Sequence, residues 1–89
     1  MLSLVHEDTV DKPTAYDYNR FTVHEDGVEV GVGTCYKWPS RTDLHFDGRR
    51  NGEVLAKQFA AQTPGAVYYP RVIARPGGLD QVQHRVRMR

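Results

Sequence analysis

The side chains that could hold a metal ion or act as a nucleophile are four histidines and a single cysteine. They are His6, His24, His45, His84 and Cys35. Structural zinc sites usually take ligands at short spacings such as Cys-x-x-Cys or His-x-x-x-His, and none of these five residues has that spacing. We therefore expect no metal ion and no other cofactor.

Nucleophilic catalysis would need Cys35 beside a basic histidine. His24 and Cys35 are expected on the same face of one hairpin, but about six positions apart, which is roughly 20 Å at the rise of a strand. The sequence has no Walker-type loop, no GxGxxG and no Gly-x-Ser-x-Gly motif. We therefore expect a buried, inert thiol and a protein that is not an enzyme. A small enzyme or metal protein centred on Cys35 or a histidine is kept as the third hypothesis.

The element that carries His24 and Cys35 is a predicted β-hairpin over residues 18–36. Asp26-Gly27 lies between two alternating runs and favours a type I′ turn, which needs positive φ at both central residues. With a two-residue loop, Val23 faces Val30, and this register gathers apolar side chains on one face of the hairpin.

The same register places Gly31 and Gly33 on the opposite, polar face, beside Thr22 and Arg20. Glycines there would leave room for the close approach of another chain. The alternative is that they mark a bend or a bulge in the strand.

A loop is expected over residues 38–50, and a helix after it. Asn51 is a candidate N-cap, apolar residues recur at helical spacing from Leu55, and Pro64-Gly65 ends the helix. A strand over residues 66–74 is predicted to lie at a sheet edge or to carry a bulge, because Pro70 cannot donate a ladder hydrogen bond. Residues 82–89 alternate apolar and basic side chains, which predicts a last strand with a basic outer face.

These elements predict an α+β fold for one domain over residues 1–89: a small antiparallel sheet in the order β-β-α-β-β, with one helix packed on one face. Leu2, Leu4 and Val5 could add an N-terminal strand. The expected core residues are Phe21, Val23, Val30, Val32, Tyr36, Leu55, Phe59, Val67 and Ile73.

Length and composition limit the class of protein. A chain of 89 residues supports one modest core, and a single cysteine excludes the disulfide framework of a small secreted domain. The first residues lack the basic start and apolar run of a signal peptide, and no stretch approaches the roughly 20 apolar residues of a membrane span. We expect a cytoplasmic protein that does not enter membranes.

The charges are unevenly distributed, and two surfaces are candidates for partner binding. Residues 1–30 hold seven acidic and two basic side chains, whereas residues 66–89 hold one acid and five arginines. The basic candidate surface, with its aromatic neighbours, is Arg20, Tyr68, Tyr69, Arg85, Arg87 and Arg89. The acidic candidate surface, which would suit a basic partner, is Glu7, Asp8, Glu25, Asp26 and Glu29.

Two functions compete for these surfaces. The first is a non-enzymatic module that binds a larger host protein or complex, for which exposed aromatics would be natural anchors. The alternative is nucleic-acid binding through the C-terminal arginine strand, with tyrosines available for stacking. Homodimerisation through an exposed edge strand is compatible with both.

The order of the predicted elements resembles that of a known class of small proteins. A hairpin around Glu25-Asp26-Gly27-Val28, the helix from Asn51 to Gln62 and the following segment from Thr63 to Tyr69 resemble small accessory proteins of phages and mobile elements, such as anti-CRISPR proteins. The resemblance covers residues 18–74 and carries over no functional residue. It implies an inhibitor that occupies a surface of a host defence or nucleic-acid-processing complex.

Overall fold

A computed structural model of the chain describes residues 1–10, 18–39 and 41–88. Its elements are, in chain order, β1 (Leu2–Val10), β2 (Tyr18–Glu25), β3 (Val28–Cys35), β4 (Asp43–Phe46), the 3-10 turn η1 (Gly48–Arg50), α1 (Gly52–Gln62), β5 (Val67–Ile73) and β6 (Gln81–Arg87).

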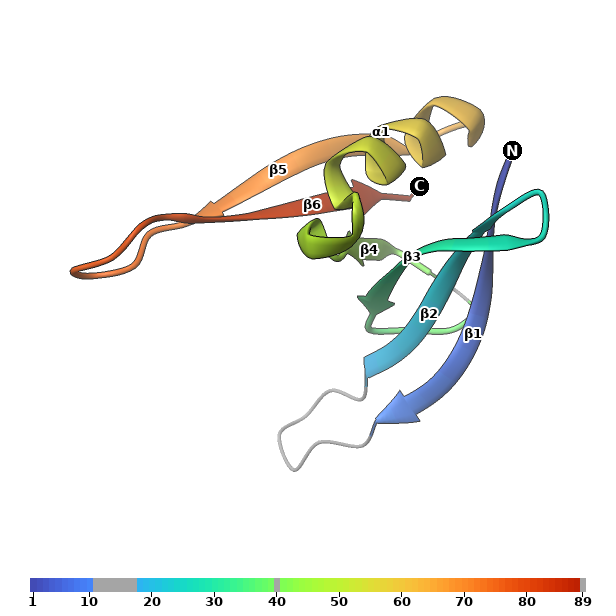
Figure 1. The fold of residues 1–89 in the computed structure, drawn as a ribbon, viewed down its shortest axis with the longest axis horizontal. Helices are drawn as coiled ribbons and strands as arrows, with labels where there is room; N and C mark the ends of the chain where they lie inside the picture. The colour runs from blue at the N-terminus through green and yellow to red at the C-terminus, as the bar shows by residue number, and fades with distance from the viewer. Residues whose placement is uncertain (11–17, 40, 89) are drawn as a thin grey trace.

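All described strands join one antiparallel sheet in the order β1-β2-β3-β4-β6-β5, and α1 covers one face of it (Figure 1). The predicted antiparallel sheet with one helix on one face is confirmed. The predicted element order is not, because β4 forms inside the expected loop and β1 adds a full strand. Asp43-Leu44-His45-Phe46 alternates polar and apolar residues, which is the period of a strand.

The β2–β3 hairpin is confirmed, but its predicted register is wrong beyond the turn. Asp26 and Gly27 both have positive φ, as a type I′ turn requires, and Glu25 faces Val28. A bulge then shifts the pairing by one residue, so that Val23 faces Gly31 and not Val30. A one-residue shift exchanges the two faces of β3 relative to β2.

This shift turns Gly31 and Gly33 toward the core, and the prediction that they lie on an outer face is wrong. Both glycines are buried. A Cβ on Gly31 would lie 2.4 Å from Leu55 of α1, and a Cβ on Gly33 would lie 2.4 Å from Phe21 Cζ. The glycines therefore let the hairpin approach the helix and an aromatic ring, and they leave no gap for another chain.

The core lies between α1 and the sheet. Phe46 contacts Phe21 edge to face and packs tilted against Phe59 of the helix. Four of the expected core residues, Phe21, Val23, Leu55 and Phe59, are buried. Tyr36 and Val67 are exposed, contrary to the prediction, while Val30, Val32 and Ile73 are partly buried. The core residues that the sequence analysis missed are Leu2, Cys35, Leu44, Phe46, Ala56 and Val86.

Asn51 occupies the N-cap position of α1 with φ of 58°, but its side chain makes no capping hydrogen bond. The structure confirms β5 as an edge strand, and it pairs with β6 without a register shift at Pro70. The β5–β6 hairpin projects well beyond α1 (Figure 1). None of the helices in the described segments is long and apolar enough to cross a membrane.

Candidate binding face

The sheet face away from α1, here called the open face, carries one row of polar side chains that crosses every strand of the sheet. Cross-strand partners point to the same face of a sheet, so a chain of direct pairs marks a row. The pairs run from Asp8 on β1 through each neighbouring strand to Tyr69 on β5. The central row is Asp8, Arg20, Thr34, His45, Arg85 and Tyr69.

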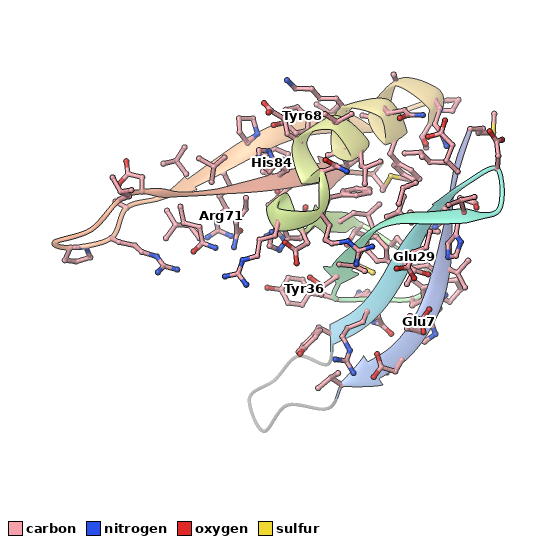
Figure 2. The ribbon with its side chains drawn as sticks, in the orientation of Figure 1. Glu7, Glu29, Tyr36, Tyr68, Arg71 and His84 are labelled. Atoms are coloured by element: carbon pink, nitrogen blue, oxygen red, sulfur yellow. The ribbon has the colours of Figure 1, made fainter. Side chains whose placement is uncertain are left out.

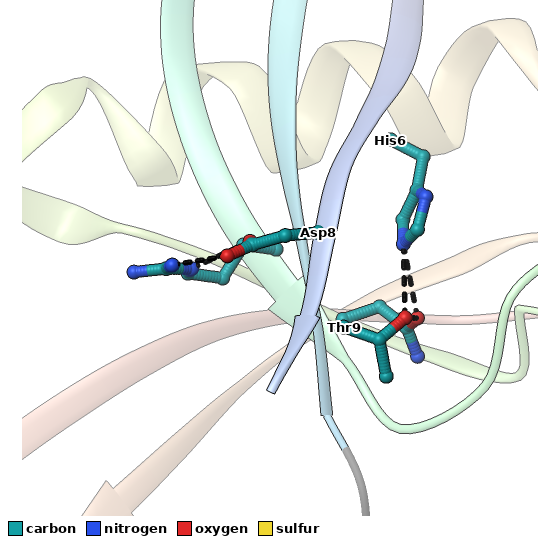
Figure 3. Close-up of polar contacts among 5 residues, drawn as sticks. His6, Asp8 and Thr9 are labelled. Carbon is teal, nitrogen blue, oxygen red and sulfur yellow. Dashed lines mark hydrogen bonds and ion pairs between the residues drawn. The ribbon is translucent and has the colours of Figure 1, made fainter. Parts of the chain in front are cut away.

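A bulge in β1 places Asp8 in the central row. The register of β1 against β2 shifts between His6 and Asp8, so these two residues face opposite sides of the strand (Figure 3). His6 stacks on Trp38 on the core side and donates from Nε2 to Asn19 Oδ1 at 3.0 Å. Without the extra residue, Asp8 would join this cluster instead of the open face.

Asp8 and Arg20 form an ion pair on the open face, in which Arg20 donates from both Nε and Nη2 (Figure 3). The hydrogen bond from Arg20 lowers the pKa of Asp8, and the pKa of Arg20 is raised in return. Both groups are exposed to solvent, so the pair contributes little to stability. It fixes the position of Arg20 at the β1–β2 end of the central row.

Arg85 is a buried charge on the open face, with 6% of its surface exposed. Its Nε donates to Asp43 Oδ1 at 3.2 Å and its Nη1 donates to Gln83 Oε1 at 2.9 Å. The hydroxyl of Tyr69 also donates to the Asp43 carboxylate. Burial works to lower the pKa of Arg85, but the hydrogen bond and charge of Asp43 outweigh it and raise that pKa. Arg85 is therefore a permanent cation.

His45 lies between Thr34 and Arg85 in the central row. Burial, and then the positive charge of Arg85, lower the pKa of His45 below 6.5, against smaller opposing effects of Asp47 and Asp43. The imidazole of His45 is therefore neutral at neutral pH, and it can accept one hydrogen bond while donating another.

The lowered pKa of His45 predicts a pH-dependent stability. Below about pH 6.5 the unfolded chain takes up a proton at this histidine before the folded chain does, so acidification lowers the free energy of unfolding. We expect the wild type to lose more stability than His45→Gln between about pH 7.5 and about pH 5, in urea unfolding at each pH. Parallel pH profiles of the two proteins would contradict the assignment.

A broad groove of about 1110 Å³ runs along the open face. Thr22, Val32 and Thr34 of β2 and β3 line it, and Leu79 and Gln81 at the end of the β5–β6 hairpin line it from the other side. Five acidic side chains and three arginines also line it. These charged residues are Glu7, Asp8, Glu29, Asp47, Asp80, Arg20, Arg49 and Arg75.

A smaller pocket of about 280 Å³ adjoins the groove, and the two hollows share Thr34 and His45. The pocket lies where β2, the end of β3, β4 and β6 meet. Its lining residues are Tyr18, Thr34, Cys35, Tyr36, His45, Gln83 and Arg85. Hydroxyl, imidazole, amide and guanidinium groups thus surround one small space.

The structure brings together only part of the predicted basic surface. Arg85 and Tyr69 share the open face, and the Arg87 guanidinium lies 5.1 Å from the centre of the Tyr69 ring. Arg85 is buried and paired, which contradicts its predicted exposure. Tyr68 lies on the helix side, where it stacks on His84, so it cannot act with Tyr69 (Figure 2). Arg89 lies outside the described residues.

The predicted acidic surface is also divided. Glu7, Asp8 and Glu29 line the groove. Glu25 instead accepts a hydrogen bond from Gln58 of α1, and Asp26 lies in the hairpin turn. Of these three predicted residues, Asp8 pairs with Arg20 and Glu29 pairs with Arg50, so much of their negative charge is already neutralised.

Sequence reasoning missed Asp43 and Gln83 and considered His45 only as a metal ligand or base, because it placed residues 38–50 in a loop and treated the outer face of the C-terminal strand as solvated. A signal was present in the alternation over residues 43–46, which places Asp43 and His45 on the face opposite Leu44 and Phe46. Gln83 and Arg85 share a face with Arg87 for the same reason.

Cys35 and His24 do not form a catalytic pair. Cys35 is buried in the core, its thiol donates to the carbonyl of Lys37 at 3.2 Å, and burial raises its pKa. His24 lies on the open face beside Thr22, so the prediction that both share a face is wrong. Within residues 1–10, 18–39 and 41–88, no three histidine, cysteine or acidic side chains are grouped so as to hold a metal ion.

No protein-family model, curated protein or solved structure matches this chain.

Proposed function

We propose that this protein is a non-enzymatic binding module that holds a segment of a larger partner protein against its open face. The observation that carries the proposal is the groove, where apolar Val32 and Leu79 lie among charged side chains. Leu79 is 92% exposed, and Val32 is partly buried. Apolar contacts surrounded by polar groups are typical of protein interfaces.

The pairing of charges on the open face supports binding over catalysis. Asp8 with Arg20 and Asp43 with Arg85 are neutralised within the protein. A carboxylate that acts as general acid or base must be free to exchange protons with a substrate, and the carboxylates of Asp8 and Asp43 are instead held by arginines. Paired charges are better suited to orienting a partner than to proton transfer.

We further propose that the partner is a host protein or complex, that binding inhibits it, and that the protein acts in the cytoplasm. The likeness to small accessory proteins of phages and mobile elements supports this part. The structure has a further strand, β4, between that hairpin and the helix. Homodimerisation through the edge strand β5 is compatible with the proposal.

Nucleic-acid binding is the alternative function. Arg71 and Arg87 are exposed and share the open face of the β5–β6 hairpin with Tyr69, which favours a stacking surface for a single strand. Against it, the groove is lined by more acidic than basic side chains, and Arg20 and Arg85 are paired with carboxylates.

Site-specific photocrosslinking tests the proposal. A benzoylphenylalanine at Leu79 lies in the groove, and one at Val54, which is 63% exposed on α1, is the matched control. In nuclease-treated lysate of the native host, we expect position 79 to form an adduct with one protein and position 54 to form none. Val32→Arg should reduce the yield from position 79 by about tenfold, because it places a charge among the apolar contacts of the groove.

Equal adduct yields from positions 79 and 54 would contradict the proposal. Adducts from position 79 that form only without nuclease, and that contain nucleic acid, would favour the alternative.

A further inference from the structure

The small pocket of the open face has a donor that is already oriented. Arg85 has five N–H donors, and the hydrogen bonds to Asp43 and Gln83 use two of them. Those two bonds and the burial of the side chain hold the guanidinium in one place. A fixed guanidinium loses little conformational entropy when a ligand binds to it.

The surrounding groups complete a polar cradle. Thr34 and His45 stand next to each other in the central row, and His45 is directly paired with Arg85. The hydroxyl of Thr34 and the ring N–H of a neutral His45 are donors of hydrogen bonds. Tyr18 and Tyr36 supply aromatic walls at the rim of the pocket. The cradle therefore combines one cation with neutral donors.

The charge of the pocket selects among anions. Asp43 forms an ion pair with Arg85 and offsets most of the positive charge of the guanidinium. The next cation on the open face is Arg87, which lies over the ring of Tyr69. A phosphate dianion needs more positive charge than this to leave water, whereas a carboxylate carries one charge and fits a guanidinium edge.

We propose that this pocket binds the carboxylate of an aspartate or glutamate side chain, and that an acidic residue of the partner segment is held there. The inference rests on the proposed function for the source of the carboxylate, but the pocket itself can be tested without the partner. It gives the open face a specificity element beside the apolar contacts of the groove.

Binding should also respond to pH through His45. Protonated His45 would add a second positive charge beside the carboxylate, so bound anion raises the pKa of His45 and affinity increases as pH falls from about 7.5 to about 6. The charged and titratable groups that act on His45 or share the pocket with it are Arg85, Asp43, Asp47, His84, Tyr18, Tyr36 and Cys35.

The probe is N-acetylglutamate α-amide, and the neutral control is N-acetylglutamine α-amide. By NMR we expect saturable shifts at the Arg85 Nε–H and the His45 ring with the glutamate compound, and no saturable shifts with the glutamine compound.

Arg85→Gln should abolish binding. Because that variant also breaks a buried ion pair, Thr34→Val is the second variant and should weaken binding about fivefold through loss of one hydroxyl. Thr42→Val, an exposed threonine outside the pocket lining, should bind as the wild type does.

Equal shifts with both compounds, equal affinities of Thr34→Val and wild type, or tighter binding of inorganic phosphate would each overturn the carboxylate assignment. The photocrosslinking result separates this inference from the proposed function. An adduct at position 79 without binding of the glutamate compound would contradict the carboxylate site but leave the proposed partner binding intact. Binding of the glutamate compound without an adduct at position 79 would contradict the proposed partner binding, and the pocket would then be a site for a small carboxylate.

Discussion

Replacing Phe46 by alanine is expected to lower the free energy of unfolding by about 4 kcal/mol. Phe46 is completely buried, lies edge to face with Phe21 and packs against Phe59 of α1. The change removes the aromatic contacts on both sides and leaves a cavity between sheet and helix. Small domains have only about 5 to 15 kcal/mol of stability, so the loss is a large fraction of the total.

Phe46 also helps to hold residues of the open face in place, because it anchors the short strand β4. β4 has four residues, and it presents Asp43 and His45 on the side opposite Phe46. We expect urea unfolding to show the loss for Phe46→Ala, with Leu79→Ala as control. Leu79 is 92% exposed, so its truncation should leave stability nearly unchanged. Similar midpoints for both variants would show that Phe46 does not anchor β4.

The sequence predicted the elements whose signals are local. Asp26-Gly27 between alternating runs identified the hairpin, and the helical spacing from Leu55 identified α1, because turn chemistry and amphipathic period depend on neighbouring residues. Pro70 correctly indicated an edge strand for the same reason.

Features that depend on pairing between strands could not be derived in this way. The bulge in β3 is one inserted residue, and nothing local distinguishes the expected pairing of Val23 with Val30 from the observed pairing with Gly31. That single shift reversed the predicted hairpin face of Cys35 and of both hairpin glycines, although the predicted burial of Cys35 is confirmed. The bulge in β1 similarly determines that Asp8, and not His6, reaches the open face.

The candidate site was predicted least well because its chemistry lies in cross-strand neighbours. Arg85 looks like an exposed residue of a basic strand, yet Asp43 and Tyr69 on two different strands enclose it. The partners are 42 and 16 positions away in the chain, so the enclosure follows from strand order and not from local pattern. The guanidinium of Arg85, which the sequence pattern predicts to be exposed to solvent, is therefore a fixed group of the pocket.

Gly33→Ala is expected to lower the free energy of unfolding by about 3 kcal/mol, although it adds only one methyl group. The new Cβ would lie 2.4 Å from the backbone oxygen of His45 and 2.4 Å from Phe21 Cζ. The oxygen belongs to β4, which pairs with β3 at this point, so relief requires the two strands to separate. His45 would move with its own carbonyl, and the central row of the open face would be displaced.

Urea unfolding measures the loss of stability for Gly33→Ala, and Gly78→Ala is the matched control. At Gly78 the nearest atom to an added Cβ is 3.9 Å away, so the same chemical change should be tolerated. We also expect Gly33→Ala to weaken binding of N-acetylglutamate α-amide in conditions where the variant is still folded, because Thr34 and His45 change their separation. A variant as stable as the wild type, with unchanged probe binding, would show that β4 can shift freely and that the central row is not held in register by the close approach at Gly33.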